Sequence, residues 1–144
     1  MRVKQYIIIN ESVHWSPAKM AVQVAHASMA AIFGKLMREK NFKWIKNHVK
    51  EEFAVYNMMV PVEIGDNWID SSFVKILLKV PNIQALDELH SKIADFDVLS
   101  AYIKDNGTTQ DAGENGKTLA IGPFDTDDEK WSELYSLIKP LKLY

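Results

Sequence analysis

A continuous apolar run followed by a helix signal occurs twice in this sequence, and no other feature restricts the fold as much. In the first copy, residues 6–9 (YIII) form a β-branched run between polar residues, as in a strand covered on both faces. Ser16 and Pro17 then provide an N-cap and a first helical residue, which predicts a long helix ending near Met37. A strand followed by a helix is the unit from which α/β proteins are built.

The second copy begins with the apolar run at residues 73–80 (FVKILLKV), after which Pro81 and Asn82 start another helix. The apolar face of that helix consists of Ile83, Leu86, Leu89, Ile93 and Phe96. Each helix needs a sheet face on which to bury its apolar stripe, so the two units indicate a layered α/β protein.

The C-terminal part adds two strands and a helix. Residues 98–104 predict a third strand and residues 118–121 a fourth, and the short connection between them favours antiparallel pairing. Thr126 and Glu129 form a capping box for a last helix, which Pro140 ends. We therefore predict one domain, residues 1–144, folded as a three-layer α/β/α sandwich around a mixed, mostly parallel four-stranded sheet.

Residues 35–67 interrupt this alternation, and we predict that they are an insertion. The basic residues of its first part are Lys35, Arg38, Lys40, Lys43, Lys46 and Lys50, with Glu39 as the acid among them. By default such a run is the solvated face of a helix, although the scarcity of acids also suits contacts with phosphate groups. The apolar residues 53–65 predict a strand or a packed extended arm.

Composition excludes several classes of protein. The 144 residues are 47% hydrophobic and 25% charged, as in an ordinary soluble domain, and the formal net charge is −2, so a polyanion would have to be held by a local basic patch. The chain has no cysteine and its 4 histidines lack metal-ligand spacing, so we expect no metal and no other cofactor. No segment has the pattern of a signal peptide or a membrane span, which favours a cytoplasmic protein without membrane contact.

A polar stripe on the first helix is the leading candidate for a functional site. Lys19, Gln23 and His26 fall on one face of a helix that is otherwise rich in alanine and methionine. This face lies just after the first strand, and α/β sheets bind ligands beyond the carboxyl ends of parallel strands. Lys79 and Asp105 stand at the ends of two further strands. All five side chains therefore have the potential to line one cleft, together with the hydroxyl groups of the following loop.

Each of these residues also has a simpler structural interpretation. Lysines at strand ends usually reach solvent, and a single histidine such as His26 between alanines is more often a hydrogen-bonded core residue than a catalyst. The loop after Asp105, which contains Thr108 and Thr109, is rich in turn-forming residues and suits a long hairpin turn.

Several motifs in order resemble the peptidyl-tRNA hydrolase family of the archaeal and eukaryotic type. Its first helix opens with G-K-x-A-x-Q-x-x-H-A, which AKMAVQVAHA matches from Lys19 to Ala27. Its strand that ends in a lysine before Ala/Val-Pro is similar to KILLKVP, and Trp68 precedes Lys75 at the expected spacing. Its D-x-G-x-T-Q loop and G-I-G-P strand end are similar to DNGTTQ and AIGP, and the terminal LKLY is the same.

The resemblance implies hydrolysis of the ester that joins a peptide to the 3′ end of tRNA, by a homodimer that needs no metal. It implies a catalytic group of Lys19, Gln23, Lys79, Asp105 and Thr109, with His26 and Thr108 in supporting positions. In this interpretation Asp105 orients the attacking water, a lysine stabilises the oxyanion, and Gln23 and Thr109 hold water and substrate. If tRNA is the substrate, the candidates for its phosphate contacts in the basic run are Lys35, Arg38, Lys43 and Lys46.

Departures from the family pattern keep two other functions open. The loop NESVHWSPA lacks the arginine and the acidic residue that the family usually has before the first helix. Thr108 stands where the family usually has an arginine, and Asp111 stands where it has an apolar residue. Ser72 and Phe73 stand where the family has Gly-Gln. One alternative is a non-catalytic RNA- or protein-binding module on the same fold, and the other is a hydrolase of a different acyl ester or amide.

Overall fold

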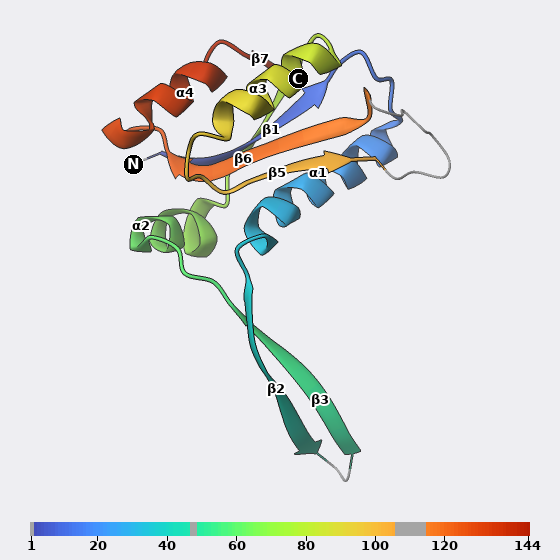
Figure 1. Cartoon of the computed structure of the whole chain (residues 1–144), viewed down its shortest axis with the longest axis vertical. Helices are drawn as coiled ribbons and strands as arrows, with labels where there is room; N and C mark the ends of the chain where they lie inside the picture. The colour runs from blue at the N-terminus through green and yellow to red at the C-terminus, as the bar shows by residue number, and fades with distance from the viewer. Residues whose placement is uncertain (1, 47–48, 106–114) are drawn as a thin grey trace.

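The computed structural model describes residues 2–46, 49–105 and 115–144, with the backbone course alone for those of residues 40–50 that it includes. A sheet lies between α1 on one face and α3 and α4 on the other (Figure 1). Its strands are β1 (Val3–Asn10), β4 (Lys75–Val80), β5 (Ser100–Lys104), β6 (Lys117–Asp125) and β7 (Lys142–Leu143). The helices that cover it are α1 (Pro17–Phe33), α3 (Ile83–Ile93) and α4 (Ser132–Ile138). The predicted three-layer α/β architecture is confirmed.

The strand order is β5-β6-β1-β4-β7, so the sheet has five strands rather than the predicted four. Among the strands of the sheet that the structure describes, only β1 and β4 pair in parallel, whereas the β1–β6, β5–β6 and β4–β7 pairs are antiparallel. The prediction of a mostly parallel sheet is therefore wrong, because β6 returns between β5 and β1 and the chain end adds a short edge strand. The carboxyl ends of β1, β4 and β5 still meet at one edge, since these three strands run in the same direction.

Two of the three apolar clusters in the described residues lie between the sheet and its covering helices. Between α1 and the sheet, Ala27 and Ala31 pack on Ile7 and Ala120, and these small side chains bring helix and sheet close together. The opposite face carries the larger core, in which the predicted apolar face of α3 is confirmed. The buried residues of this larger core are Tyr6, Ile8, Leu78, Val80, Leu86, Leu89, Ile93, Leu119, Ile121, Phe124, Leu134 and Ile138.

One polar contact crosses the core beneath α1. The amide nitrogen of Gln5, a residue of β1 that is fully buried, donates to the carbonyl oxygens of Ser28 (3.1 Å) and Gly122 (3.3 Å). The Ser28 hydroxyl donates to Gln5 Oε1 at 2.5 Å. Apolar packing is non-directional, whereas these hydrogen bonds form at one position of the helix. They therefore fix how α1 is rotated and shifted along the sheet.

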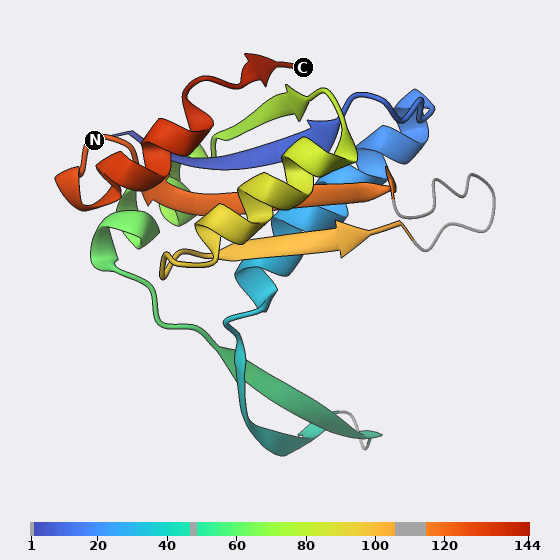
Figure 2. The same ribbon diagram turned by 45° about the horizontal axis from the view of Figure 1, so that its top comes forward.

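The segment predicted as an insertion contains a β-hairpin that projects away from the sandwich (Figures 1 and 2). Helix α1 ends at Phe33 rather than near Met37, and β2 (Met37–Lys46) then pairs with β3 (Val49–Asn57). The prediction of a helix face for the basic run is thus wrong. The register places Phe42 opposite Phe53 and Lys43 opposite Glu52, and a partner strand satisfies the backbone hydrogen-bonding groups that a helix would otherwise pair internally.

After the hairpin the chain forms α2 (Val62–Ile64), which continues into the wide π-helical turns of η1 (Gly65–Ser72). Trp68 is fully buried, and its ring stacks on Phe73 with the ring centres 4.3 Å apart. Phe73 adopts a left-handed φ of 52°, and Lys75 Nζ lies 3.4 Å from the centre of its ring. Burial lowers the pKa of the Lys75 ammonium group.

The last helix starts with the short 3-10 turn η3 (Glu129–Trp131). The N-cap is Asp128, whose carboxylate accepts from the Lys130 amide, whereas the Thr126 hydroxyl donates to the Arg2 carbonyl oxygen. The predicted capping box of Thr126 and Glu129 is therefore wrong, since Thr126 instead ties the end of β6 to the chain start. Within the part of the chain that the structure describes, no helix is long and apolar enough to cross a membrane.

Candidate active site

Asp105 lies at the centre of the polar group that the structure assembles. It follows β5 directly, is only 4% exposed, and its backbone amide donates to the Gly116 carbonyl oxygen at 2.7 Å. Lys19 Nζ is 2.8 Å from Asp105 Oδ1, and Gln23 Nε2 donates to the same oxygen at 3.3 Å. The structure thus brings together Lys19, Gln23 and Asp105 at the carboxyl edge of the sheet, as the sequence predicts.

Local features of α1 explain this arrangement. The Ser16 hydroxyl accepts from the Lys19 amide at 3.2 Å and Pro17 occupies the first turn, so the helix starts where the sequence signals it. Lys19 and Gln23 are one turn apart and therefore face the same strand end. The contact between Gln5 and Ser28 then sets the rotation of the helix that points both side chains at Asp105.

The electrostatics of this group favour an ordered carboxylate. The Asp105 side chain is 1% exposed, and a buried charge is costly unless an opposite charge or hydrogen-bond donors compensate it. Lys19 supplies the charge, and its side chain keeps 18% of its surface exposed, so the ammonium group lies at the border between the site and solvent. A cation in that position can meet both Asp105 and a negatively charged oxygen of a bound substrate.

Two buried oxygen atoms near the carboxyl edge lack a hydrogen-bond partner among the residues that the structure describes. They are Gln23 Oε1 and Thr118 Oγ1. Thr118 lies in β6 and pairs in register with Ile103 and Ile9, on the same sheet face as α1. Buried polar atoms nearly always have partners, so both oxygens are available to a water molecule or a substrate group.

Lys79 forms a second and separate ion pair. Its Nζ lies 3.1 Å from Glu11 Oε2, and both side chains are partly exposed. Lys79 pairs in register with Ile9, and β4 is separated from β5 by β1 and β6. Three strand spacings correspond to about 14 Å, so the lysine is not in contact with Asp105. Sequence reasoning missed Glu11, although an acid directly after the first strand at this edge was a usable signal.

The other predicted site residues have different positions. His26 is exposed, and no described contact joins it to Lys19, Gln23 or Asp105. Thr108 and Thr109, like the departure at Asp111, lie outside the described residues. Of the predicted tRNA contacts, Lys35 precedes the hairpin, and Arg38, Lys43 and Lys46 belong to β2.

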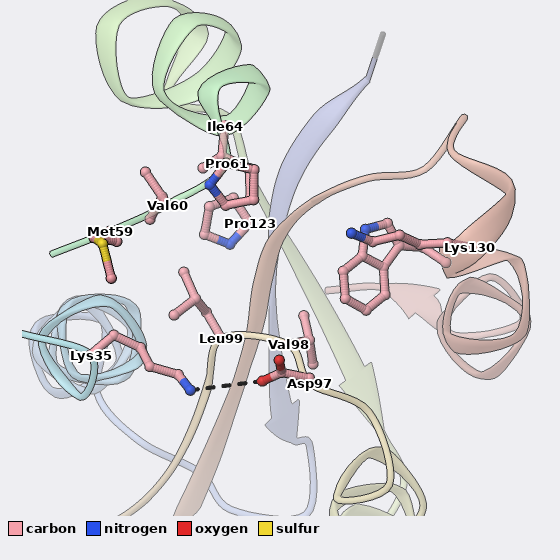
Figure 3. A pocket seen from close by; sticks show the side chains of 11 residues that line it. Lys35, Met59, Val60, Pro61, Ile64, Asp97, Val98, Leu99, Pro123 and Lys130 are labelled. Atoms are coloured by element: carbon pink, nitrogen blue, oxygen red, sulfur yellow. Dashed lines mark ion pairs between the residues drawn. The ribbon is translucent and has the colours of Figure 1, made fainter.

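Lys35 lines a cavity of about 250 Å³ at the opposite edge of the sheet (Figure 3). Its Nζ lies 3.8 Å from Asp97 Oδ1, and both side chains are well exposed. Pro61 and Pro123 contribute to the apolar wall. Because Lys35 follows the last turn of α1 and Lys19 belongs to the first, this cavity is distinct from the Asp105 site. No group of three or more potential metal ligands occurs in the described part of the chain.

The fold and the lysine-paired carboxylate define an α/β protein with a polar site at one sheet edge. The profile of the family described as "Peptidyl-tRNA hydrolase PTH2" matches residues 3–144. The chain therefore belongs to the peptidyl-tRNA hydrolase PTH2 family.

Individual relatives agree with this assignment. The chain is 26% identical over 123 residues to a protein named peptidyl-tRNA hydrolase from Thermoplasma volcanium, covering 85% of this chain and 86% of the relative. It is 29% identical over 122 residues to the protein of that name from Thermococcus onnurineus, covering 85% of each chain. It is also 27% identical over 121 residues to peptidyl-tRNA hydrolase 2 of Saccharomyces cerevisiae, covering 84% of this chain but 50% of the longer yeast protein.

Proposed function

We propose that this protein hydrolyses the ester bond of peptidyl-tRNA or of an N-blocked aminoacyl-tRNA, releasing tRNA and the free peptide. Family membership supports the reaction class. The observation that carries the proposal is the geometry of Lys19, Gln23 and Asp105, which combines a cation with a buried carboxylate and an amide at one sheet edge. Ester hydrolysis needs a positioned water and stabilisation of a developing oxyanion, and these groups suit both tasks.

In the proposed reaction a water oxygen bonds to the ester carbon and the carbon–oxygen bond to ribose breaks. One water proton ends on the ribose oxygen, the other is released to solvent, and the peptide leaves as a carboxylate. Asp105 orients the water, because a carboxylate that already accepts from Lys19 and Gln23 is better suited to orientation than to proton abstraction. Lys19 stabilises the oxyanion, and Gln23 Oε1 holds the second hydrogen of the water.

The remaining roles follow from position. Lys79, held by Glu11 at the same edge, contacts the substrate away from the scissile bond. Thr109, with Thr108 beside it, holds the substrate from the loop that follows Asp105. Lys35, Arg38, Lys43 and Lys46 contact tRNA phosphates, and His26 supports the outer rim. We further propose that residues 1–144 form one domain, that the protein acts in translation in the cytoplasm as a homodimer, and that it needs no cofactor.

Release of free tRNA from N-acetylaminoacyl-tRNA tests the activity. The parent should release tRNA, whereas Lys19→Ala and Asp105→Asn should each lower kcat at least roughly 100-fold, the usual cost of removing one transition-state contact. Lys92→Ala is the control, since Lys92 is an exposed lysine that pairs with Glu88 on α3. Circular dichroism verifies that all variants fold.

Two results would replace the proposal with its alternatives. Binding of tRNA by the parent without hydrolysis would identify a non-catalytic RNA-binding module. Cleavage of a simple acyl ester or amide, with N-acetylaminoacyl-tRNA left intact, would identify a hydrolase of another substrate.

A further inference from the structure

The β2–β3 hairpin holds three of the residues proposed to contact tRNA phosphates, Arg38, Lys43 and Lys46, and its position in the molecule indicates which part of a tRNA it meets. Its strands contact chiefly each other, and both figures of the whole chain show it extending away from the sheet and its helices (Figures 1 and 2). An isolated two-stranded hairpin is only marginally stable in water. Burying its large side chains would stabilise such a hairpin, yet Phe53 is 45% exposed and Tyr56 is 54% exposed. Large exposed side chains on a projecting ribbon indicate a surface that contacts another molecule.

The charge of the hairpin identifies the kind of molecule. The whole chain has 17 lysines and arginines against 19 acids, so its overall field does not attract a polyanion. The hairpin and its entry reverse this balance, with Lys35, Arg38, Lys40, Lys43, Lys46 and Lys50 against Glu39, Glu51 and Glu52. Arg38 pairs in register with Tyr56, so a cation and an aromatic ring lie side by side near the base. Basic residues interleaved with aromatic ones are typical of surfaces that bind nucleic acid.

The position of the hairpin limits which part of a tRNA it can contact. Lys19 and Gln23 lie in the first turns of α1, whereas β2 begins shortly after the last turn. The axial distance from Lys19 to Phe33 is about 21 Å, and β3 extends about 30 Å further from that base. The outer part of the hairpin, to which Lys43 and Lys46 belong, therefore lies beyond the reach of a short single-stranded 3′ end bound at Lys19 and Asp105. It is suitably placed for the double-stranded stem behind that end.

We propose that the β2–β3 hairpin binds the phosphate backbone of the tRNA stem and makes the enzyme selective for full-length tRNA esters over short 3′-terminal fragments. This inference rests on the proposed function, because it takes the scissile ester to lie at Lys19 and Asp105. Stem contacts of this kind are independent of sequence, since A-form RNA exposes phosphates and 2′-hydroxyl groups rather than readable base edges.

The test compares two substrates that carry the same ester, N-acetylaminoacyl-tRNA and the N-acetylaminoacyl ester of the trinucleotide CCA. The hairpin variant is Lys43→Ser/Lys46→Ser. The matched control is Lys92→Ser/Lys139→Ser, which removes the same charge from exposed positions at α3 and α4. The ratio of kcat/KM for the full tRNA to that for the short ester should fall roughly tenfold in the hairpin variant and less than about twofold in the control. The log–log salt slope for the full tRNA should flatten by about one unit per lost contact.

A second variant, in which a short Gly-Ser linker replaces residues 37–57, should change the ratio in the same direction, with its folding verified by thermal melting. Equal losses on both substrates, or an unchanged ratio, would overturn the inference. An unchanged ratio together with a dimer that dissociates when the hairpin is altered, seen by sedimentation, would show that the surface binds a second copy instead.

The failure of the proposed function is distinguishable from the failure of this inference. If the parent cleaves neither ester, binding of uncharged tRNA is measured by fluorescence anisotropy. Binding weakened roughly tenfold in the hairpin variant would retain the RNA surface and reject the hydrolase. Equal binding by parent and variant would reject the RNA surface.

Discussion

Lys79 Nζ lies 3.1 Å from Glu11 Oε2, at the same sheet edge as Asp105 but on the far side of β6 and β1. The edge therefore carries two lysines with separate acidic partners rather than one cluster. Of these two lysines, Lys19 is the one whose ion pair to the buried Asp105 carboxylate the structure describes. The pair of Lys79 and Glu11 is partly exposed, and solvent screens such a pair strongly.

Replacing Lys79 should impair substrate binding more than the chemical step. We expect Lys79→Met to raise KM severalfold with a smaller change in kcat, because about 14 Å of sheet separates this lysine from Asp105. The melting temperature should change little, since the ion pair is partly exposed. Steady-state kinetics on N-acetylaminoacyl-tRNA measure both constants. A fall in kcat as large as that of Asp105→Asn would place Lys79 at the reacting ester.

Removing Lys19 should also cost stability, because it takes away the ammonium group that lies 2.8 Å from a buried carboxylate. Lys19→Ala should lower the free energy of unfolding by about 1–3 kcal/mol. Asp105→Asn added to Lys19→Ala should recover part of that loss, so the two changes should not be additive. Urea unfolding of both single variants and the double variant measures this coupling. Strictly additive losses would mean that the 2.8 Å contact contributes nothing to the fold.

The two faces of α1 should respond differently to truncation. Gln23→Ala removes a contact to Asp105 and should lower hydrolysis while largely sparing stability, because it exposes a polar site. Val24→Ala removes methyl groups from the core beneath α1 and should cost on the order of 1–3 kcal/mol while sparing the chemistry of the folded fraction. Thermal melts paired with initial rates test both. Early melting of Gln23→Ala with full activity would assign the polar stripe a purely structural role.

Alkaline pH should destabilise the domain through Tyr6. Burial, with a smaller contribution from Tyr135, raises the pKa of the Tyr6 phenol from its usual 10.0 to about 12. A raised phenol pKa favours the folded state below pH 10, and this contribution is lost as the pH rises towards 12. Burial and the hydrogen bond to Asp87 also raise the pKa of Tyr102, which adds to the effect.

Urea midpoints at pH 9 and at pH 11.5 measure this loss. Tyr6→Phe should reduce the difference between the two midpoints, whereas Tyr56→Phe, on the exposed hairpin, should leave it unchanged. The same difference in Tyr6→Phe as in the parent would exclude Tyr6 as the group responsible.

The sequence predicted the parts of the site that depend on local geometry. Helical spacing placed Lys19 and Gln23 on one face, and the strand signal before Asp105 placed the carboxylate at the matching edge. The partner of Lys79 was not predicted: Glu11 directly follows β1, which places it at this edge, but the lysine that it meets depends on the path of the loop after β1. The first helix was predicted to end near Met37 but ends at Phe33. The basic run that follows, with its alternating aromatic residues, suits a helix or a strand until a partner strand is present.

The short edge strand and special backbone geometry were also beyond the sequence. β7 consists of Lys142 and Leu143, too few residues for a recognisable pattern. Phe73 adopts a left-handed φ that bulky residues rarely take, and its stacking on Trp68 stabilises a conformation that no propensity would suggest. Such features depend on tertiary contacts rather than on the residues beside them.

The hydrogen bonds between Gln5 and Ser28 contribute little to the packing of this domain but fix the position of the site residues on α1. Ala27 and Ala31 present a smooth surface to the sheet, on which α1 could shift with little loss of apolar contact. A chain in which the polar contact loosened would keep its helices, its strands and both cores, yet Lys19 and Gln23 would no longer meet Asp105. We therefore expect heat inactivation to precede heat unfolding in this protein, and we expect the first to depend on Gln5, which lies at the far end of β1 from the site.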